Sequence, residues 1–114
     1  MKKSISVLFI VAALIFSATT VFAASGSSLF SSDGCIACHA VNGQGGSVGP
    51  DLSHVGSKRS LSWLKTQITN PDAHFAAGAN VNINGQSYQA IMPGHRHMAS
   101  SKLNALSAYL ESLK

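Results

Sequence analysis

The stretch Cys35-Ile36-Ala37-Cys38-His39 decides the interpretation of this 114-residue chain, because it contains both of its cysteines in the spacing C-x-x-C-H. Two thiols separated by two residues can bond to the two vinyl groups on one edge of a porphyrin, and the next residue can present an imidazole nitrogen to the iron. We therefore expect Cys35 and Cys38 to attach one c-type haem covalently, and His39 to be an axial metal ligand.

Three other interpretations of the cysteine pair fit the sequence less well. A thioredoxin-like redox pair requires a βαβ context, which the pattern does not show. A zinc site requires four well-placed ligands, and the adjacent Cys38 and His39 are awkward partners on one ion. A disulfide between Cys35 and Cys38 closes too small a loop to stabilise a fold much. The sequence therefore favours haem attachment.

The first 23 residues have the layout of a secretory signal peptide. A basic start at Met1–Lys3 precedes the apolar run Ile5–Phe16, and Val21–Ala23 gives a small-residue cleavage pattern. The run of about 12 residues is shorter than the roughly 20 that a spanning helix needs, although an uncleaved membrane anchor is the alternative. We expect a signal peptide at 1–23, a single domain at 24–114 and no stable membrane insertion after cleavage.

Composition and charge exclude several classes of protein. The chain is 46% hydrophobic and 11% charged, which argues against disorder. Its formal charge of +4 becomes +2 after removal of residues 1–23, with six Lys and Arg against four Asp and Glu. The cations are scattered, so we expect no nucleic-acid or membrane-surface binding. Covalent haem attachment takes place outside the cytoplasm, which agrees with export to a periplasmic or other extracytoplasmic location.

The middle of the chain predicts one helix and one hairpin. Ser60 is a plausible N-cap for a helix with an apolar face at Leu61, Leu64 and Ile68, and Asn70-Pro71 ends it. Asn84-Gly85 is the strongest short hairpin signal, and the residues on either side, Val81–Ile83 and Gln86–Gln89, predict the two strands.

The remaining segments predict two more helices and a loop. Leu29-Phe30 begins a short helix that runs into Cys35, after a frayed segment at 24–28, and the glycine-rich stretch Val41–Pro50 predicts a loop. Near the C-terminus an apolar stripe predicts a helix for which Ser100 or Ser101 can supply the cap. The stripe consists of Leu103, Leu106, Leu110 and Leu113, with Tyr109 beside it.

Met92 is the best candidate for the sixth iron ligand. The Pro-Gly dipeptide that follows it makes a stiff turn that can hold a thioether sulfur toward the ring. Met98 precedes the last helix, where an apolar residue commonly packs into the core. The histidines at 74, 95 and 97 are alternative ligands, and an open position is the last alternative.

The chain resembles the class I monohaem cytochromes c over nearly all of residues 27–114. It is similar to the cytochrome c domains fused to subunit II of some haem–copper oxidases, and to small bacterial electron carriers. The resemblance implies an all-α fold, with about three or four helices around one haem and a short β-hairpin before the axial methionine loop. The segments that carry it are Cys35–His39, Gly49–Leu52, Tyr88–Gly94 and Leu103–Leu113.

The resemblance also implies roles for residues outside the attachment motif. The carbonyl of Pro50 would accept a hydrogen bond from His39 and orient its ring, and Phe30 in the first helix would cross the last helix near Tyr109. The sequence departs from the family at Ala99–Lys102, where the last helix begins without acidic residues, and at 95–97, where His-Arg-His follows the methionine loop.

The implied function is one-electron transfer, without enzymatic activity, between redox protein partners such as a terminal oxidase or another respiratory complex. The alternative is a haem sensor or small peroxidase with an open sixth position. We expect a monomer in which Trp63 and Arg59 contact the haem propionates, while Lys58-Arg59 and His95–His97 steer acidic partners. The expected apolar walls of the haem pocket are Val41, Leu52, Trp63, Leu64, Ile68, Tyr88 and Leu106.

Overall fold

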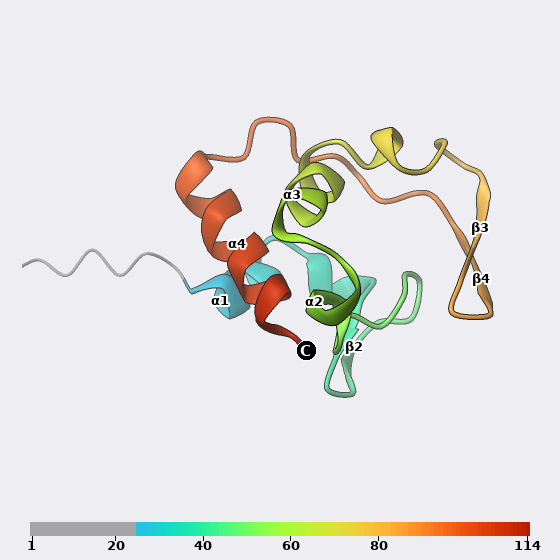
Figure 1. Ribbon diagram of the computed structural model, residues 1–114, viewed down its shortest axis with the longest axis horizontal. Helices are drawn as coiled ribbons and strands as arrows, with labels where there is room; N and C mark the ends of the chain where they lie inside the picture. Colours follow the sequence, from blue (N-terminus) through green and yellow to red (C-terminus); the bar gives the residue numbers. More distant parts are fainter. Residues whose placement is uncertain (1–24) are drawn as a thin grey trace, which may run out of the picture.

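The computed structural model describes residues 25–114, so the predicted signal peptide at 1–23 lies outside the described residues. Within this part of the chain, no helix is long and apolar enough to cross a membrane. The elements in chain order are α1 (Gly26–Ser32), the 3-10 helix η1 (Cys35–Ala37), β1 (Ala40–Val41), β2 (Gln44–Gly45), α2 (Val55–Lys58), α3 (Leu61–Thr69), the 3-10 helix η2 (Pro71–Ala73), β3 (Asn80–Ile83), β4 (Gln86–Gln89) and α4 (Ser100–Ser112) (Figure 1).

The prediction of an all-α fold is wrong, because the described residues contain two small antiparallel sheets beside four α-helices. The predicted hairpin is present as β3–β4, but a second hairpin, β1–β2, lies in the stretch that was expected to be loop. Its turn is Asn42-Gly43, with φ angles of 51° and 78°. Two successive residues with positive φ reverse the chain within a two-residue loop, and Asn-Gly adopts them readily. The fold is therefore mixed.

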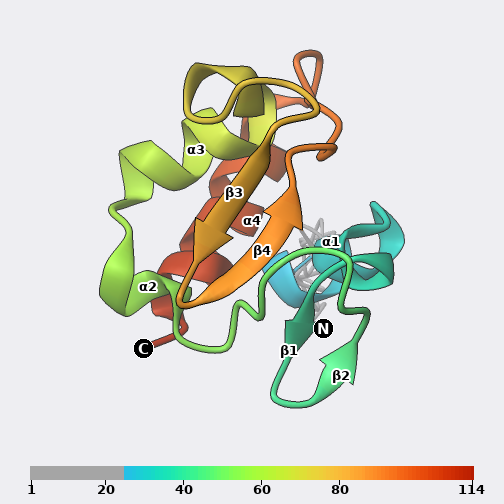
Figure 2. The same ribbon diagram turned by 90° about the vertical axis from the view of Figure 1, so that its right-hand side faces the viewer.

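The β3–β4 hairpin confirms the turn signal at Asn84-Gly85. These two residues have φ angles of 52° and 83°, and the side-chain oxygen of Asn82 accepts a hydrogen bond from the Gly85 amide at 3.1 Å. Val81 pairs with Tyr88 in the register of the two strands. The hairpin lies on the opposite side of the molecule from α1 (Figure 1), and it crosses in front of α4 when the molecule is turned (Figure 2).

Of three predictions about where helices begin, one is confirmed and two are wrong. Ser60 caps α3 as predicted, since its hydroxyl accepts from the Trp63 amide at 3.2 Å, and the helix ends before Asn70. The expected frayed segment is wrong, because Ser25 caps a helix that begins at Gly26. The predicted serine caps of α4 are also wrong, since the N-cap is Ala99, which makes no side-chain cap bond, and the serines at 100 and 101 lie inside the first turn.

The core forms where α1 and α3 pack against α4 (Figure 1). The Phe30 and Tyr109 rings meet edge to face with centroids 6.1 Å apart, which is the predicted contact between the first and last helices. Gly26 faces the Ala105 carbonyl and the Tyr109 Cβ so closely that a Cβ at this position would collide with both. The buried hydrophobic residues are Leu29, Phe30, Val41, Leu64, Ile68, Leu106 and Leu110.

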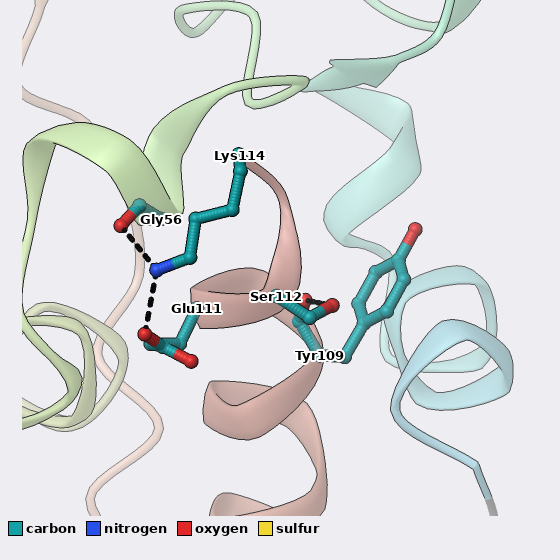
Figure 3. A network of polar contacts seen from close by, with 5 residues as sticks. All are labelled: Gly56, Tyr109, Glu111, Ser112 and Lys114. Carbon is teal, nitrogen blue, oxygen red and sulfur yellow. Dashed lines mark hydrogen bonds and ion pairs between the residues drawn. The ribbon is translucent and has the colours of Figure 1, made fainter.

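The end of α4 is tied to α2 by the polar contacts shown in Figure 3. The Lys114 ammonium pairs with Glu111 at 2.7 Å and donates to the Gly56 carbonyl at 3.0 Å, while the Gly56 amide donates to Leu113 at 2.7 Å. His54 contacts the main-chain oxygen of Lys114 through Nδ1 at 2.8 Å. An exposed ion pair contributes little stability. The set of contacts instead fixes the position of α2, which forms one wall of the site described next.

Candidate functional site

A cavity of about 720 Å³ lies between the helices, the attachment motif, the β3–β4 hairpin and the loop that follows β4. Its volume is within the range of small-molecule and cofactor pockets. Of the apolar wall residues predicted from the sequence, all line this cavity except Val41, which is buried in the core instead. The lining residues from that prediction are Leu52, Trp63, Leu64, Ile68, Tyr88 and Leu106.

The attachment motif, Cys35–His39, forms a tight turn at the wall of the cavity. Gly34, with φ at 82°, leads into η1, and the amides of Cys38 and His39 both donate to the Cys35 carbonyl, at 3.2 and 2.9 Å. This turn places both cysteines and the histidine on the wall of one cavity. Both thiols are free, with Cys35 half-buried and Cys38 exposed. Burial, followed by the negative charge of Asp33, raises the pKa of the Cys35 thiol, so it is protonated near neutral pH.

The His39 ring is held by the segment Gly49-Pro50. Its Nδ1 lies 2.8 Å from the Pro50 carbonyl, which is the contact that the family resemblance implies. A carbonyl oxygen only accepts, so Nδ1 carries the proton, and in the neutral ring Nε2 then has a free lone pair. Gly49 packs against the ring so closely that a Cβ would lie 2.5 Å from Cε1. The arrangement orients an imidazole whose free nitrogen can bind a metal.

Met92 supplies a thioether to the same cavity from the loop after β4. Its sulfur accepts a hydrogen bond from Gln67 Nε2 on α3 at 3.5 Å. The loop is fixed to the end of α3, because the His95 amide donates to the Ile68 carbonyl at 2.9 Å and Gly94 packs close to the Thr69 carbonyl. A half-buried thioether with one lone pair still free is therefore available on the cavity wall.

The structure places the alternative ligands differently from Met92. His95 lines the cavity, whereas His74, His97 and Met98 are not among its lining residues. His74 bonds to Gln67 through Nδ1 at 2.9 Å and stacks on Trp63, His97 is exposed, and Met98 packs against the core. Of these four side chains, only His95 lines the same cavity as Met92.

Arg59 and Trp63, the predicted propionate contacts, lie together at the edge of the cavity. The Arg59 guanidinium carbon is 4.3 Å from the centroid of the Trp63 ring, a cation–π contact, and both residues line the cavity, as does Lys58. Arg96 lies outside the lining and donates to the Asn70 side chain at 3.4 Å. The cationic side chains of Lys58 and Arg59 therefore line an otherwise apolar pocket, where they can pair with anionic groups such as the haem propionates.

The donor set fits a haem group. Two free thiols, one oriented imidazole and one thioether open into the same apolar cavity. Among residues 25–114, no group of three or more His, Cys, Asp or Glu residues is arranged to hold a metal ion.

Sequence reasoning missed Gln67 and the role of Gly49. Gln67 follows Leu64 by three residues and precedes Ile68, so it is a polar residue on the apolar face of its helix. That exception to the pattern was the available signal. For Gly49, no local signal distinguished contact with His39 from an ordinary turn.

Comparison with known proteins supports this assignment. Residues 23–114 match the Cytochrome c family. The chain is 30% identical over 97 residues to cytochrome c oxidase subunit 2 of Alkalihalophilus pseudofirmus, covering 84% of this chain and 27% of that protein. It is 31% identical over 93 residues to lupanine 17-hydroxylase [cytochrome c] of a Pseudomonas species, covering 81% of this chain and 11% of that protein. The chain thus spans well under a third of either relative, and no solved structure gives a significant match.

Proposed function

We propose, from the premise that this chain belongs to the cytochrome c family and carries a covalently bound haem c, that it transfers single electrons with His39 and Met92 as axial ligands. The observation that carries the proposal is that an oriented imidazole and a thioether, each held by a hydrogen bond, open into one apolar cavity beside two thiols. Cys35 and Cys38 hold the haem through thioether bonds, and the group supplies a one-electron couple.

Two axial ligands, both from the wall of the cavity, would favour an electron carrier over an enzyme. With His39 and Met92 both bound to the iron, the group would offer no open position to a substrate or oxidant. One electron enters from a reduced donor protein and one leaves to an oxidised acceptor, and no atom is transferred. The rigid attachment of both ligand loops, through Pro50 and through Ile68, keeps reorganisation small.

The surroundings of the ligands set the balance between the two oxidation states. A thioether ligand and a dry, apolar pocket favour the ferrous state and raise the potential. The hydrogen bond from His39 to Pro50 acts in the opposite direction, because it makes the imidazole a stronger donor and so favours the ferric state.

The ligation is tested by the ferric absorption spectrum of the haem-loaded protein. Ligation by histidine and methionine gives a weak charge-transfer band at the red end of the spectrum. The wild type and Met98→Ala should both show this band, and Met92→Ala should lose it. Absence of the band from the wild type, or its loss in Met98→Ala alone, contradicts the assignment of Met92.

We further propose that the protein acts outside the cytoplasm and that its acceptor is a respiratory complex such as a terminal oxidase. The signal-like residues 1–23 support the location, and the similarity to an oxidase subunit supports the class of partner. Fusion of the wild-type leader, and of a leader lacking its apolar run, to a reporter enzyme active only after export tests the location. Equal reporter activity from both fusions would refute it.

Steering by charge is a separate part of the proposal. Lys58 and Arg59 line the cavity, and long-range attraction between such cations and an acidic partner accelerates encounter. Raising ionic strength from about 0.01 M to about 1 M shortens the screening length from about 30 Å to about 3 Å. The electron-transfer rate to the acceptor should fall over this range, whereas a flat response excludes steering.

A further inference from the structure

The side chain of Gln67 joins the proposed ligand Met92 to a histidine outside the cavity lining. Its Nε2 donates to the Met92 sulfur at 3.5 Å, and its Oε1 lies 2.9 Å from Nδ1 of His74. One amide group therefore has a partner at each end, and all three side chains are half-buried. The orientation of the amide decides whether Met92 meets an N–H donor or an oxygen.

The His74 ring is itself held in place. The residue follows η2, its amide donates to the Pro71 carbonyl at 3.0 Å, and its ring lies parallel to Trp63 with centroids 4.2 Å apart. Trp63 in turn contacts Arg59. The stacking fixes the ring plane, and the contact with Gln67 fixes which edge of the ring faces the amide.

The hydrogen-bonding capacity of each atom determines the direction of this chain of contacts. The Gln67 carbonyl oxygen only accepts, so Nδ1 of His74 must carry a proton. If the ring lacked a donor at this position, the amide would gain by turning over and giving its own N–H to His74. That rotation would place the amide oxygen against the Met92 sulfur, and two groups with lone pairs would face each other.

We propose that His74 is a positioning residue that, through Gln67, keeps an N–H donor on the Met92 sulfur and thereby raises the midpoint potential of the carrier. The inference rests on the proposed ligation by Met92. An N–H donor withdraws electron density from the sulfur, which reduces its ability to stabilise the ferric state. In a half-buried site the effect is screened less than in water.

The size of the effect follows from the strength of one hydrogen bond. Loss of a typical net hydrogen bond corresponds to a change of about fivefold in an equilibrium constant. If Gln67→Leu removes the donor, the ferrous-to-ferric ratio at a fixed ambient potential should fall by at most about fivefold, because only the difference in bond strength between the two oxidation states counts. At about 59 mV per tenfold change for one electron, that is a decrease of at most about 40 mV in midpoint potential.

The variants separate hydrogen bonding from packing. His74→Phe keeps a ring that can stack on Trp63 but gives the Gln67 oxygen no donor, so the amide is no longer held in one orientation and the midpoint potential should fall, by no more than in Gln67→Leu. His74→Gln loses the ring but retains an amide N–H for Gln67, so it should keep a potential close to that of the wild type. The midpoint potential of the double variant His74→Phe with Gln67→Leu should be no lower than that of Gln67→Leu alone, because both changes act on the same hydrogen bond to Met92.

The measurements are potentiometric titration, the ferric spectrum and thermal unfolding, all on the haem-loaded protein at one pH. A fall in melting temperature without a change in potential in His74→Phe would show a merely structural role and overturn the proposal. So would a fall in potential in Gln67→Leu that is wholly absent from His74→Phe. Should His74→Phe not fold, an unchanged potential in Gln67→Leu overturns the proposal by itself.

The two proposals fail in different ways. A wild type without the methionine band contradicts Met92 ligation, and the present inference falls with it. A wild type with the band, whose potential is unaffected by Gln67→Leu, leaves the proposed function intact and refutes only the role of Gln67 and His74.

Discussion

Gly49→Ala should damage the site through the His39 ring rather than through the backbone. A Cβ at position 49 would lie 2.5 Å from Cε1 and 2.8 Å from Nδ1 of His39, well inside ordinary van der Waals contact at 3.4–4 Å. The ring would have to recede by about 1 Å to relieve this contact. The hydrogen bond of 2.8 Å to Pro50 would then lengthen beyond about 3.5 Å, where it is no longer a hydrogen bond.

The cost can be worked from these two effects. Overpacking by one carbon costs about 1–3 kcal/mol, and loss of the hydrogen bond adds about 1 kcal/mol. The total of about 2–4 kcal/mol is a large part of the 5–15 kcal/mol that stabilises a typical domain. For a domain of this size it lowers the melting temperature by about 10–25 °C. Because the imidazole becomes a weaker donor, the midpoint potential should rise, by at most about 40 mV if the full 1 kcal/mol acts on the ferric state.

The assay is potentiometric titration and thermal unfolding of the haem-loaded Gly49→Ala variant. Ser47→Ala is the matched control, since it changes an exposed residue in the same loop and should alter neither quantity. A variant with the wild-type melting temperature and potential would show that the ring adjusts without strain, and would refute the role assigned to Gly49. A lower potential would instead refute the direction assigned to the bond between His39 and Pro50.

Three further changes test the fold around the site. Gly26→Ala should cost about 1–3 kcal/mol of unfolding free energy, measured by denaturant titration, because its methyl group would press α1 away from α4; an unchanged midpoint contradicts the close approach. Leu106→Ala should cost about 2–5 kcal/mol in the same assay, since Leu106 is 1% exposed and also lines the cavity; a loss below 1 kcal/mol would place it outside the core. Hydrogen bonds from the Ser53 hydroxyl and amide lower the pKa of Asp51. The ionised carboxylate therefore stabilises the fold fully above its unfolded pKa of 3.8, and this stabilisation is lost as pH falls through the lower pKa of the folded state. In Asp51→Asn, the melting temperature should therefore fall less steeply with decreasing pH in the acid range than in the wild type. The same pH dependence in both proteins would contradict this role of Asp51.

The sequence predicted the features that depend on neighbouring residues. The C-x-x-C-H motif needs only five consecutive residues, and the cap at Ser60 and the turn at Asn84-Gly85 need only a few more. The same Asn-Gly signal is present at residues 42–43, but each strand there has only two residues. Alternation of polar and apolar side chains cannot be recognised over two residues, so the sequence pattern predicts a loop there. The all-α class, by contrast, is what the family resemblance implies.

The contacts that refine the site could not be predicted in the same way, because they join residues that are distant in the chain. The bond from Gln67 to Met92 spans 25 positions, and the contact of Gly49 with His39 arises only when the glycine-rich loop folds back on the motif. A polar residue on an apolar helix face indicates that some partner exists. It does not indicate which one.

The fold and the haem pocket are made from the same side chains, and this explains why the contacts to the ligands matter for stability as well as for potential. Five of the seven buried core residues also line the cavity, namely Phe30, Leu64, Ile68, Leu106 and Leu110. A group that binds the folded chain and not the unfolded chain stabilises the fold by its binding free energy. A substitution that loosens either ligand therefore weakens the binding that helps to hold the core together. For this reason, the midpoint potential and the melting temperature of each variant have to be measured together. Only the two quantities together distinguish a change in the iron ligands from a loss of core packing.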